Sequence, residues 1–308
     1  MKIPSKVYPY RLPYMGSKQN IAYSIMMAIA QKKPKAKYFF DIFGGGASMS
    51  LMAKQFGLKV FYSEKNGGIV NLLNFLKNNK IPKEWIKWVD REEFKKCLGK
   101  EDPYSVFVTV VWSFGNNRQA YLFGKDIEEL KRLAFEVIVN RDFECLEKLK
   151  KETGLKLTMP NEAKLHDRRL SFSKQIKTIK AFNRGCPELM RIQSLTQLEC
   201  CSRLQQLEYL QQLEYLNGLD YPNEEVIIYC DPPYRGTAEY TDGGFNYKEF
   251  DDWVRKLKYD VFISEYNTPF ERIASFGKMS LLNNSKDKKP LISENLYFHK
   301  TEVKNENN

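Results

Sequence analysis

The stretch YFFDIFGGGA, residues 38–47, decides the fold class of this 308-residue chain. Its apolar first half predicts a buried strand, and the glycines at positions 44, 45 and 46 predict a tight turn. A helix is predicted next, over residues 47–56, because Gly57 can end it. A second strand and a second helix follow at residues 59–63 and 69–77. Strand, turn, helix and strand in this order form a βαβ unit, which implies a parallel sheet.

The middle of the chain differs in composition from its two ends. Ser17 predicts the start of a helix over residues 18–30, and short β-branched strands return late, at residues 226–229 and 261–264. Residues 79–190 are rich in lysine and have helical patterns. We therefore expect a discontinuous core over residues 1–78 and 220–308, a mostly helical insertion over residues 79–190, and a leucine-rich segment over residues 191–219.

The leucine-rich segment contains an internal repeat, because QQLEYL at residues 205–210 recurs unchanged at residues 211–216. Its apolar residues recur every three positions. In an α-helix a step of three residues falls about 60° short of a full turn, and a strand requires a period of two. Neither regular element fits this period, so we interpret the repeat as an expansion tolerated in a surface excursion. A short solenoid-like stack of turns is the alternative.

The net charge of +11 is unevenly distributed along the chain. Residues 1–37 hold seven lysines and one arginine without an acidic residue, and a second basic stretch covers residues 163–191. Basic surfaces of this kind suit a polyanion such as nucleic acid. A solvated surface has the same composition, so charge alone leaves both interpretations open.

Histidine and cysteine usage limits the chemistry. The two histidines, His166 and His299, are too few for a histidine-rich metal site, and a Ser-His-Asp triad would need one of them to be specially placed. The six cysteines include no C-x-x-C pair, which predicts reduced thiols and no zinc site. The apolar run at residues 25–30 is too short for a secretory signal or a membrane span. Any chemistry is therefore expected to rest on carboxylates, backbone groups and aromatic rings, without a metal.

An acidic residue follows the glycine turn at a characteristic distance. Glu64 lies twenty residues after Gly44, at the end of the second predicted strand. A carboxylate at that position can accept hydrogen bonds from both hydroxyls of a ribose. Enzymes that bind nicotinamide, flavin or S-adenosylmethionine share this arrangement. The glycines depart from G-x-G-x-x-G, which disfavours a phosphate-gripping dinucleotide site, and an ordinary strand-to-helix turn is the structural alternative.

A second motif, Asp231-Pro232-Pro233-Tyr234, directly follows the apolar strand at residues 226–229. Two prolines predict a rigid loop at the carboxyl end of a strand, the edge where ligands bind in open α/β sheets. The Asp231 carboxylate and the Pro232 carbonyl can accept the two N–H groups of a planar amine, and the Tyr234 ring can stack on its base. The alternative is a proline-stiffened turn with a surface aspartate.

Taken together, these motifs resemble the Dam-type adenine-specific DNA methyltransferases of the alpha arrangement. In that arrangement a cofactor motif comes first, the target-recognition region second and the catalytic motif last. The matching stretches are PYMGSK at residues 13–18, DIFGGGA at 41–47, SEKN at 63–66, DPPY at 231–234 and VFISEYNT at 261–268.

The resemblance implies a fold and a set of site residues. The fold would be an α/β, Rossmann-like, S-adenosylmethionine-dependent methyltransferase sheet with helices on both faces and an inserted, mostly helical target-recognition region. The reaction would transfer a methyl group from S-adenosylmethionine to the N6 amine of an adenine flipped out of the duplex, without a metal. The implied catalytic residues are Asp231, Pro232, Pro233 and Tyr234. The implied cofactor contacts are Tyr14, Lys18, Asp41, Phe43, Gly44, Gly46, Glu64 and Asp231.

The implied partner is double-stranded DNA, read at a specific site. Asn116, Asn117 and Arg118 lie in a polar loop and have side chains that read base edges, although an ordinary polar turn has the same composition. Arg168 and Arg169 belong to the second basic stretch and would contact phosphates. The resemblance places the protein in the cytoplasm of a prokaryotic or phage-infected cell. It is compatible with a monomer, and with a restriction-modification system in which a cognate restriction enzyme is a partner.

Three alternatives remain open at this point. The first is the same chemistry on another base, the N4 amine of cytosine in DNA or a base in RNA. The aspartate at the head of the tetrad favours adenine, whereas serine is common in the cytosine enzymes of the wider group. The second is a nicotinamide-dependent dehydrogenase built on the same βαβ start. The third is a DNA-binding relative that has lost catalysis.

Overall fold

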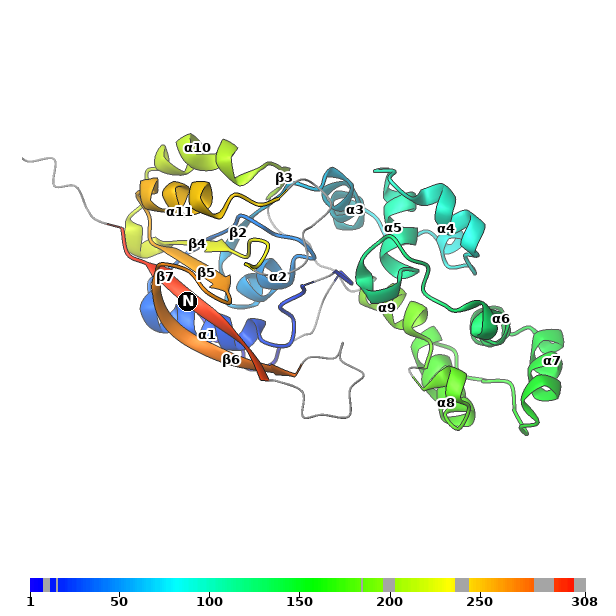
Figure 1. Ribbon diagram of the computed structural model, residues 1–308. Helices are drawn as coiled ribbons and strands as arrows, with labels where there is room; N and C mark the ends of the chain where they lie inside the picture. The colour runs from blue at the N-terminus through cyan, green and yellow to red at the C-terminus, as the bar shows by residue number, and fades with distance from the viewer. Residues whose placement is uncertain are drawn as a thin grey trace, which may run out of the picture. The chain divides into compact units, whose positions relative to one another are not determined.

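The computed structural model describes residues 1–7, 12–14, 16–183, 185–195, 203–235, 244–279 and 291–301 (Figure 1). Its contacts divide the chain into two compact units. Unit 1 comprises Met1–Pro9, Ser17–Val70 and Cys200–Asn308, and unit 2 comprises Tyr10–Gly16 and Asn71–Glu199. The assignment of roles to residues 1–78 and 220–308, 79–190 and 191–219 stays a prediction.

Unit 1 is built on a seven-stranded sheet in the order β3-β2-β1-β4-β5-β7-β6. Its strands are β1 (Tyr38–Asp41), β2 (Lys59–Glu64), β3 (Arg203–Gln206), β4 (Val226–Cys230), β5 (Val261–Glu265), β6 (Glu271–Met279) and β7 (Leu291–His299). The first five strands of the sheet order pair in parallel, whereas β7 runs antiparallel to both β5 and β6. The βαβ unit predicted from the sequence is confirmed, since β1 and β2 pair in parallel.

The order of the strands reverses between β1 and β4, which are direct neighbours although nearly two hundred residues separate them. Asp41 at the end of β1 is in register with Tyr229 near the end of β4. The glycine turn and the DPPY loop therefore leave the same edge of the sheet side by side. In open α/β sheets this switch point is where ligands bind.

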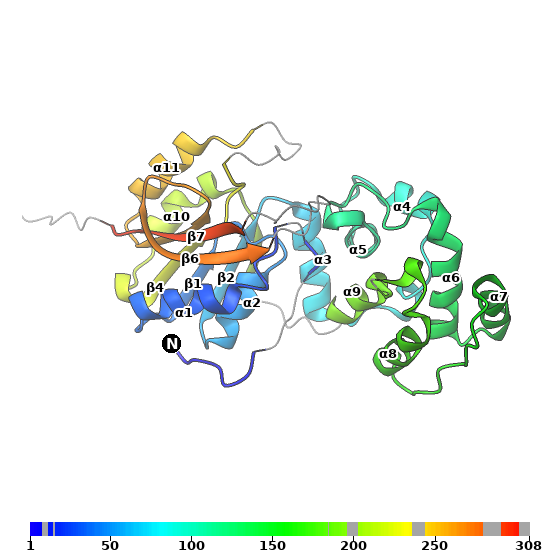
Figure 2. The same ribbon diagram turned by 60° about the horizontal axis from the view of Figure 1, so that its bottom comes forward.

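Helices cover both faces of the sheet (Figures 1 and 2). Helices α1 (Ala22–Lys32) and α2 (Ser48–Gln55) lie on one side, and α10 (Leu213–Asn217) and α11 (Tyr247–Lys256) lie on the other. Successive side chains of a strand point to opposite faces of the sheet, so both faces need a covering layer. On the α10 and α11 side, the covered side chains include Phe40, Ile228 and Ile263.

Helix α1 begins later than Ser17 predicts. Its first helical residue is Ala22, and the preceding Ile21 provides no side-chain cap. The Ser17 hydroxyl instead forms a hydrogen bond of 2.7 Å with the hydroxyl of Ser48, at the start of α2. The segment between Ser17 and Ile21 is thus tied to the glycine turn, which carries Lys18 into the interior, where 4 % of it is exposed.

The QQLEYL repeat is not a surface excursion or a stack of turns, so both interpretations of it were wrong. Its two copies adopt different structures: the first ends β3 and enters a 3-10 turn (Tyr209–Gln212), and the second forms the end of that turn and α10. Strand β3 pairs with β2 at the edge of the sheet. Gln212 is buried and its side-chain oxygen accepts a hydrogen bond of 3.0 Å from the Ser63 hydroxyl. The repeat therefore contributes an edge strand, a short helix and the buried residues Gln212 and Leu216 to unit 1.

Unit 2 is helical in the part of the chain that the structure describes. Its helices are α4 (Arg91–Cys97), α5 (Pro103–Val111), α6 (Lys125–Asn140), α7 (Phe143–Thr153), α8 (Leu165–Ile176) and α9 (Pro187–Leu195), while α3 (Gly67–Asn78) runs through the boundary of the units. Asp102 caps α5, the apolar helix at the centre of unit 2. Among the described residues, no helix is long and apolar enough to cross a membrane.

Candidate active site

The glycine turn is shaped by the ring of Tyr62 on β2. A Cβ atom on Gly44 would lie 2.1 Å from a Tyr62 ring carbon, so only glycine fits there. The Tyr62 hydroxyl donates a hydrogen bond of 2.8 Å to the Gly45 carbonyl, and the Gly44 N–H donates to the Ser63 carbonyl. Gly45 and Ala47 both adopt positive φ. The turn is thus held tightly against β2, and buried Gly46 lies within it.

Asp41 lies at the base of this turn and is 1 % exposed. Its carboxylate accepts a hydrogen bond of 2.6 Å from the Ser50 hydroxyl on α2. Burial raises the pKa of Asp41 to about 7, the Ser50 hydrogen bond opposes this rise, and the charges of Asp231 and Glu64 add to it. Carboxylates from three neighbouring strands therefore face one region, and their repulsion favours a cation there.

Glu64 ends β2 and is organised by backbone groups. One carboxylate oxygen accepts a hydrogen bond of 2.8 Å from the Gly45 N–H, and the other accepts one of 2.9 Å from the Asn66 N–H. Each oxygen of an ionised carboxylate has a second lone pair. The side chain is half-buried, and its geometry is compatible with the two ribose hydroxyls expected from the sequence.

The Asp231 carboxylate has one oxygen anchored and one oxygen unused. Oδ2 lies 2.6 Å from the Nζ atom of Lys18, while Oδ1 is buried and accepts no hydrogen bond from the described residues. Burial raises the pKa of Asp231 to about 6; the Lys18 charge limits the rise and the Glu294 charge adds to it. A buried acceptor without a donor is costly, so this oxygen indicates a place where a ligand donates.

Lys18 and Tyr234 meet at a second carboxylate, Glu294 of β7. The Lys18 Nζ atom is 3.1 Å from Glu294 Oε1, and the Tyr234 hydroxyl donates a hydrogen bond of 2.6 Å to the same oxygen. Lys18 also lies over the Tyr234 ring, 4.7 Å from its centre, and the ring contacts that of Tyr266 edge to face. Burial opposes the charge of Lys18, but Asp231 and Glu294 outweigh it and hold the pKa of the ammonium above its ordinary value.

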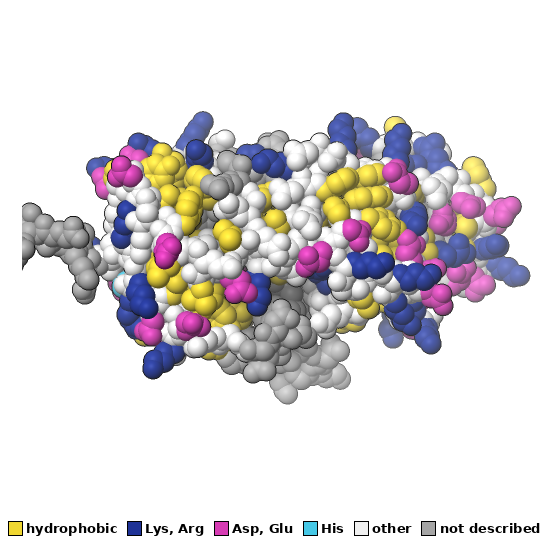
Figure 3. Space-filling model, turned by 90° about the horizontal axis from the view of Figure 1, so that it is seen from above, with side chains coloured by type: hydrophobic (Ala, Val, Ile, Leu, Met, Phe, Trp, Pro, Cys, Tyr) yellow, Lys and Arg dark blue, Asp and Glu magenta, His cyan; other side chains and the backbone are white. Residues whose placement is uncertain are grey.

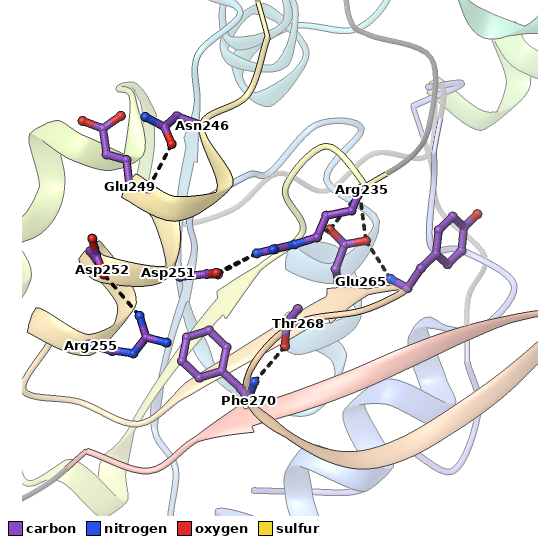
Figure 4. Close-up of polar contacts among 10 residues, drawn as sticks. Arg235, Asn246, Glu249, Asp251, Asp252, Arg255, Glu265, Thr268 and Phe270 are labelled. Carbon is purple, nitrogen blue, oxygen red and sulfur yellow. Dashed lines mark hydrogen bonds and ion pairs between the residues drawn. The ribbon is translucent and has the colours of Figure 1, made fainter.

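The residue after the tetrad locks its loop to the sheet and to α11 (Figure 4). The Arg235 guanidinium forms two hydrogen bonds of 2.8 Å with the Asp251 carboxylate. Its backbone N–H donates to Glu265 at 3.0 Å, and Glu265 also accepts from the Tyr266 N–H. Bidentate pairs of this kind fix direction as well as distance. The DPPY loop is therefore held at its end by a buried strand residue and a helix residue.

Phe43, a predicted cofactor contact, lies in an aromatic cluster on the α11 side of the sheet. Its ring is 5.4 Å from that of Tyr209 and 5.7 Å from that of Phe250. Phe43 is only partly buried, so its contact with a cofactor remains a prediction. Tyr14 belongs to unit 2, and its cofactor contact remains a prediction as well.

The three predicted base-reading residues share a loop whose backbone is strained. Asn116 and Arg118 both have a φ of 59°, a left-handed conformation that asparagine tolerates and arginine rarely adopts. The Asn117 side chain accepts hydrogen bonds from the Gln119 and Ala120 N–H groups and so closes the turn itself. Arg191 of α9 anchors the base of the loop by donating to two backbone carbonyls. Strain held in this way is typical of functional loops, and the DNA-reading role of the three residues stays a prediction.

Arg168 and Arg169 are neighbours on α8 with different surroundings. Arg168 lies near Glu162 and Arg141, and burial together with the Arg141 charge lowers its pKa. Burial raises the pKa of Glu188, and the charge of nearby Arg169 partly opposes that rise. Figure 3 shows that the face of unit 2 seen there carries acidic and basic side chains side by side. Unit 2 also contains the ion pairs Arg132–Glu129 and Lys150–Glu147. That face is not uniformly basic, and the phosphate contacts of Arg168 and Arg169 stay predictions.

The sequence patterns missed several residues of this site. Glu294 lies in the late segment LISENLYFH, where a lone carboxylate inside an apolar strand was the available signal. Glu265 sat inside the stretch VFISEYNT but was not singled out. Tyr62 and Ser50 had no signal, since a tyrosine in a strand and a serine in a helix are common. Among the described residues, no group of three or more His, Cys, Asp or Glu side chains is arranged to hold a metal ion.

A largely parallel sheet with a glycine turn and a carboxylate loop at its switch point is the arrangement of nucleotide-binding enzymes, the class that includes the methyltransferases. The family model of the D12 class N6 adenine-specific DNA methyltransferases matches residues 14–159. Over that stretch the chain is similar to this family of enzymes, which confirms the predicted relationship, fold class and reaction. The match contains Lys18, the glycine turn and Glu64, and it ends before the DPPY loop. No match was found among curated proteins.

Proposed function

We propose that the protein transfers a methyl group from S-adenosylmethionine to the N6 amine of adenine in double-stranded DNA, with Asp231 as the residue that binds the amine. The unused, buried Oδ1 atom of Asp231 carries this proposal. It lies at the switch point of the sheet, while the other oxygen of the same carboxylate is fixed by Lys18. An amine N–H can satisfy it without breaking an existing contact.

The residues around the glycine turn fit the proposed methyl donor. S-adenosylmethionine, when bound, supplies a methyl group on a positively charged sulfur. Asp41 and Asp231 make this edge of the sheet negative, which favours a cation. Glu64 is fixed at the end of β2 by the Gly45 and Asn66 N–H groups, where its carboxylate can accept from ribose hydroxyls, and the glycine turn packs rigidly beside it.

The chain's own groups perform the reaction by positioning. The adenine amine is a weak nucleophile because its lone pair is delocalised into the ring. Asp231 Oδ1 accepts one N–H and the Pro232 carbonyl accepts the other, which directs the lone pair out of the ring plane. Pro233 keeps the loop rigid, and Tyr234 contacts the flipped base. The bond between the amine nitrogen and the methyl carbon would form as the methyl–sulfur bond breaks, the sulfur would leave as a neutral thioether, and the methylated nitrogen would then release one proton to solvent. Orientation and electrostatics supply most of the rate, so no strong general base is required.

Unit 2 supplies the proposed contacts with DNA. Asn116, Asn117 and Arg118 read base edges, while Arg168 and Arg169 hold phosphates. We propose that the protein acts as a monomer in the cytoplasm of a prokaryotic or phage-infected cell, where a cognate restriction enzyme would be the natural partner of such an activity.

The proposed function is tested by replacing the amine-binding carboxylate. Asp231→Ala is expected to lower kcat for methyl transfer to duplex DNA by at least about 100-fold, because an acceptor positioned for the transition state is lost. DNA affinity should stay within about twofold, since phosphate contacts dominate it. The matched control is Asp252→Ala on the outer face of α11, where the carboxylate is 51 % exposed, and it should leave kcat unchanged.

The product identifies the base. Mass analysis of nucleosides from treated DNA should show N6-methyladenine made by the wild type and lost in the Asp231 variant. Wild-type activity in that variant would contradict the role of Asp231. N4-methylcytosine without N6-methyladenine would contradict the choice of base.

A further inference from the structure

We infer that Glu294 is a positioning residue of the methyl transfer, because it fixes the Tyr234 hydroxyl and shares the Lys18 ammonium with Asp231. The inference rests on the proposed function and assigns a role to a strand that none of the sequence motifs singled out. Glu294 is not proposed to contact the adenine or the cofactor. It acts through the two side chains that flank the amine-binding carboxylate.

The topology of the sheet explains how a residue so late in the chain reaches the tetrad. Strand β7 runs antiparallel to β5, and Asn295 is in register with Glu265, the last residue of β5. Glu294 therefore lies just beyond the carboxyl end of β5. That is the edge from which the DPPY loop leaves β4, the parallel neighbour of β5. An antiparallel strand is required here, since it brings its amino-terminal end to this edge.

Glu294 is linked to the tetrad through Lys18 and through Tyr234. Its Oε1 atom accepts a hydrogen bond of 2.6 Å from the Tyr234 hydroxyl and lies 3.1 Å from Lys18 Nζ. The same Nζ atom is 2.6 Å from Asp231 Oδ2. One ammonium thus joins the two carboxylates, and one carboxylate joins the ammonium to the tyrosine. Both ends of the tetrad are oriented through this set.

Because these charged residues are buried, the loss of any one of them is expected to disturb the positions of the others. Glu294 is 1 % exposed and Lys18 is 4 % exposed, so water cannot replace a lost partner. Removing one member of a buried charged pair leaves the other uncompensated. Without Glu294, the Tyr234 hydroxyl loses its acceptor at 2.6 Å, and Lys18 loses one of the two carboxylates that it pairs with. A small displacement of the amine-binding loop is enough to slow a reaction that depends on positioning.

The charge of Glu294 also acts on the pKa of Asp231. A change in that pKa can be measured in the pH dependence of the rate, and a purely structural role of Glu294 would not change it. The groups whose charges reach Asp231 or respond to it are Lys18, Asp41, Tyr229, Cys230, Tyr234, Glu265 and Glu294. Of these, Glu294 raises the pKa of Asp231 and Lys18 lowers it. Replacing Glu294 by a neutral side chain of the same shape must therefore lower the pKa of Asp231.

The experiment compares Glu294→Gln with the wild type in steady-state methylation of duplex DNA across pH 5 to 9. Glutamine keeps an oxygen that can accept from Tyr234 and removes the charge. We expect kcat to fall about 10- to 100-fold, with the KM for DNA unchanged, and the acidic limb of the rate profile to move to lower pH. The matched control is Glu271→Gln on β6, whose side chain is 64 % exposed and should leave both quantities unchanged.

A double-mutant cycle of Glu294→Ala and Tyr234→Phe tests the route through the hydroxyl, because alanine removes the acceptor that glutamine keeps. If Glu294 acts partly by holding Tyr234, the two substitutions together slow transfer by less than the product of their separate effects. Independent, multiplying effects would overturn that route. A folded Glu294→Gln enzyme with wild-type kcat and an unmoved acidic limb would overturn the inference as a whole. A wild type that makes no N6-methyladenine would instead refute the proposed function, so the two failures are distinguishable.

Discussion

Gly44 shows how a single residue of the cofactor motif can be required by the protein's own packing. The sequence predicted a tight turn at the glycines, and the resemblance implied cofactor contacts at Gly44 and Gly46. In the structure, the missing side chain of Gly44 accommodates the ring of Tyr62, whose hydroxyl then holds the Gly45 carbonyl. Packing against β2 thus fixes the conformation of the turn, and no ligand is needed to form it.

A substitution at this position should therefore cost stability as well as ligand affinity. Gly44→Ala would place a Cβ atom 2.1 Å from a Tyr62 ring carbon, and the ring would have to move. We expect a loss of about 1–3 kcal/mol in the free energy of unfolding, measured in urea, and weaker binding of S-adenosylmethionine by calorimetry. Combining it with Tyr62→Val should recover part of the stability. A Gly44→Ala protein with wild-type stability and affinity would show that the ring is not a constraint.

At the scale of elements, identical sequence takes different structure in the two copies of QQLEYL. Leu210 and Leu216 occupy the same position in the repeat, yet Leu210 is 41 % exposed and Leu216 is fully buried against the core of unit 1. The neighbours decide this outcome. β2 offers an edge for pairing to the first copy, whereas the face of the sheet beneath α10 receives the second.

The two leucines give a matched pair of substitutions. Leu216→Ala should lower the free energy of unfolding by about 2–5 kcal/mol, because it leaves a cavity in the core. Leu210→Ala should change it by no more than about 0.5 kcal/mol. Urea denaturation followed by circular dichroism measures both. Equal losses at the two positions would mean that the copies are equivalent in the fold, contrary to the pairing of β3 and the burial of α10.

The sequence predicts features that local residues determine, and it does not predict features that depend on contacts between distant segments. Strands β1, β2, β4 and β5 were predictable, since each is a short apolar run beside a turn signal. The loops at Asp41 and Asp231 could be placed at one edge, because parallel strands align their carboxyl ends. Strand β3 and residue Glu294 could not be predicted, since each depends on pairing with a strand far away in the sequence. Helix α1 was misplaced at its start because Ser17 binds Ser48, a tertiary contact, in place of capping the helix.

On the scale of the whole molecule, each unit contains a buried carboxyl group with a strongly raised pKa. In unit 1, burial raises the pKa of Asp41 to about 7, and this residue lies in the candidate active site. In unit 2, burial raises the pKa of Glu188 to about 7, and its two carboxylate oxygens accept no hydrogen bond from another residue in the described part of the chain. Both groups bind a proton more tightly in the folded protein than in the unfolded chain, so folding and proton binding are coupled in both units.

This coupling predicts the pH dependence of stability. The ordinary pKa values are 3.8 for Asp41 and 4.5 for Glu188, so their contributions to stability are fully present below about pH 4 and are lost as the pH rises to about 7. At about 1.4 kcal/mol per pKa unit, each group lowers the free energy of unfolding by a few kcal/mol at pH 8 relative to pH 4. Asp41→Asn and Glu188→Gln remove the ionisation, so each variant should become more stable than the wild type as the pH rises through this window. Scanning calorimetry at pH 5 and pH 8 measures the effect, with the exposed Glu271→Gln as a control.

Asp41→Asn should also weaken binding of S-adenosylmethionine, because it removes a negative charge from the site, whereas Glu188→Gln should not. Parallel pH dependences in all four proteins would contradict the coupling, and equal ligand affinities would remove Asp41 from the site.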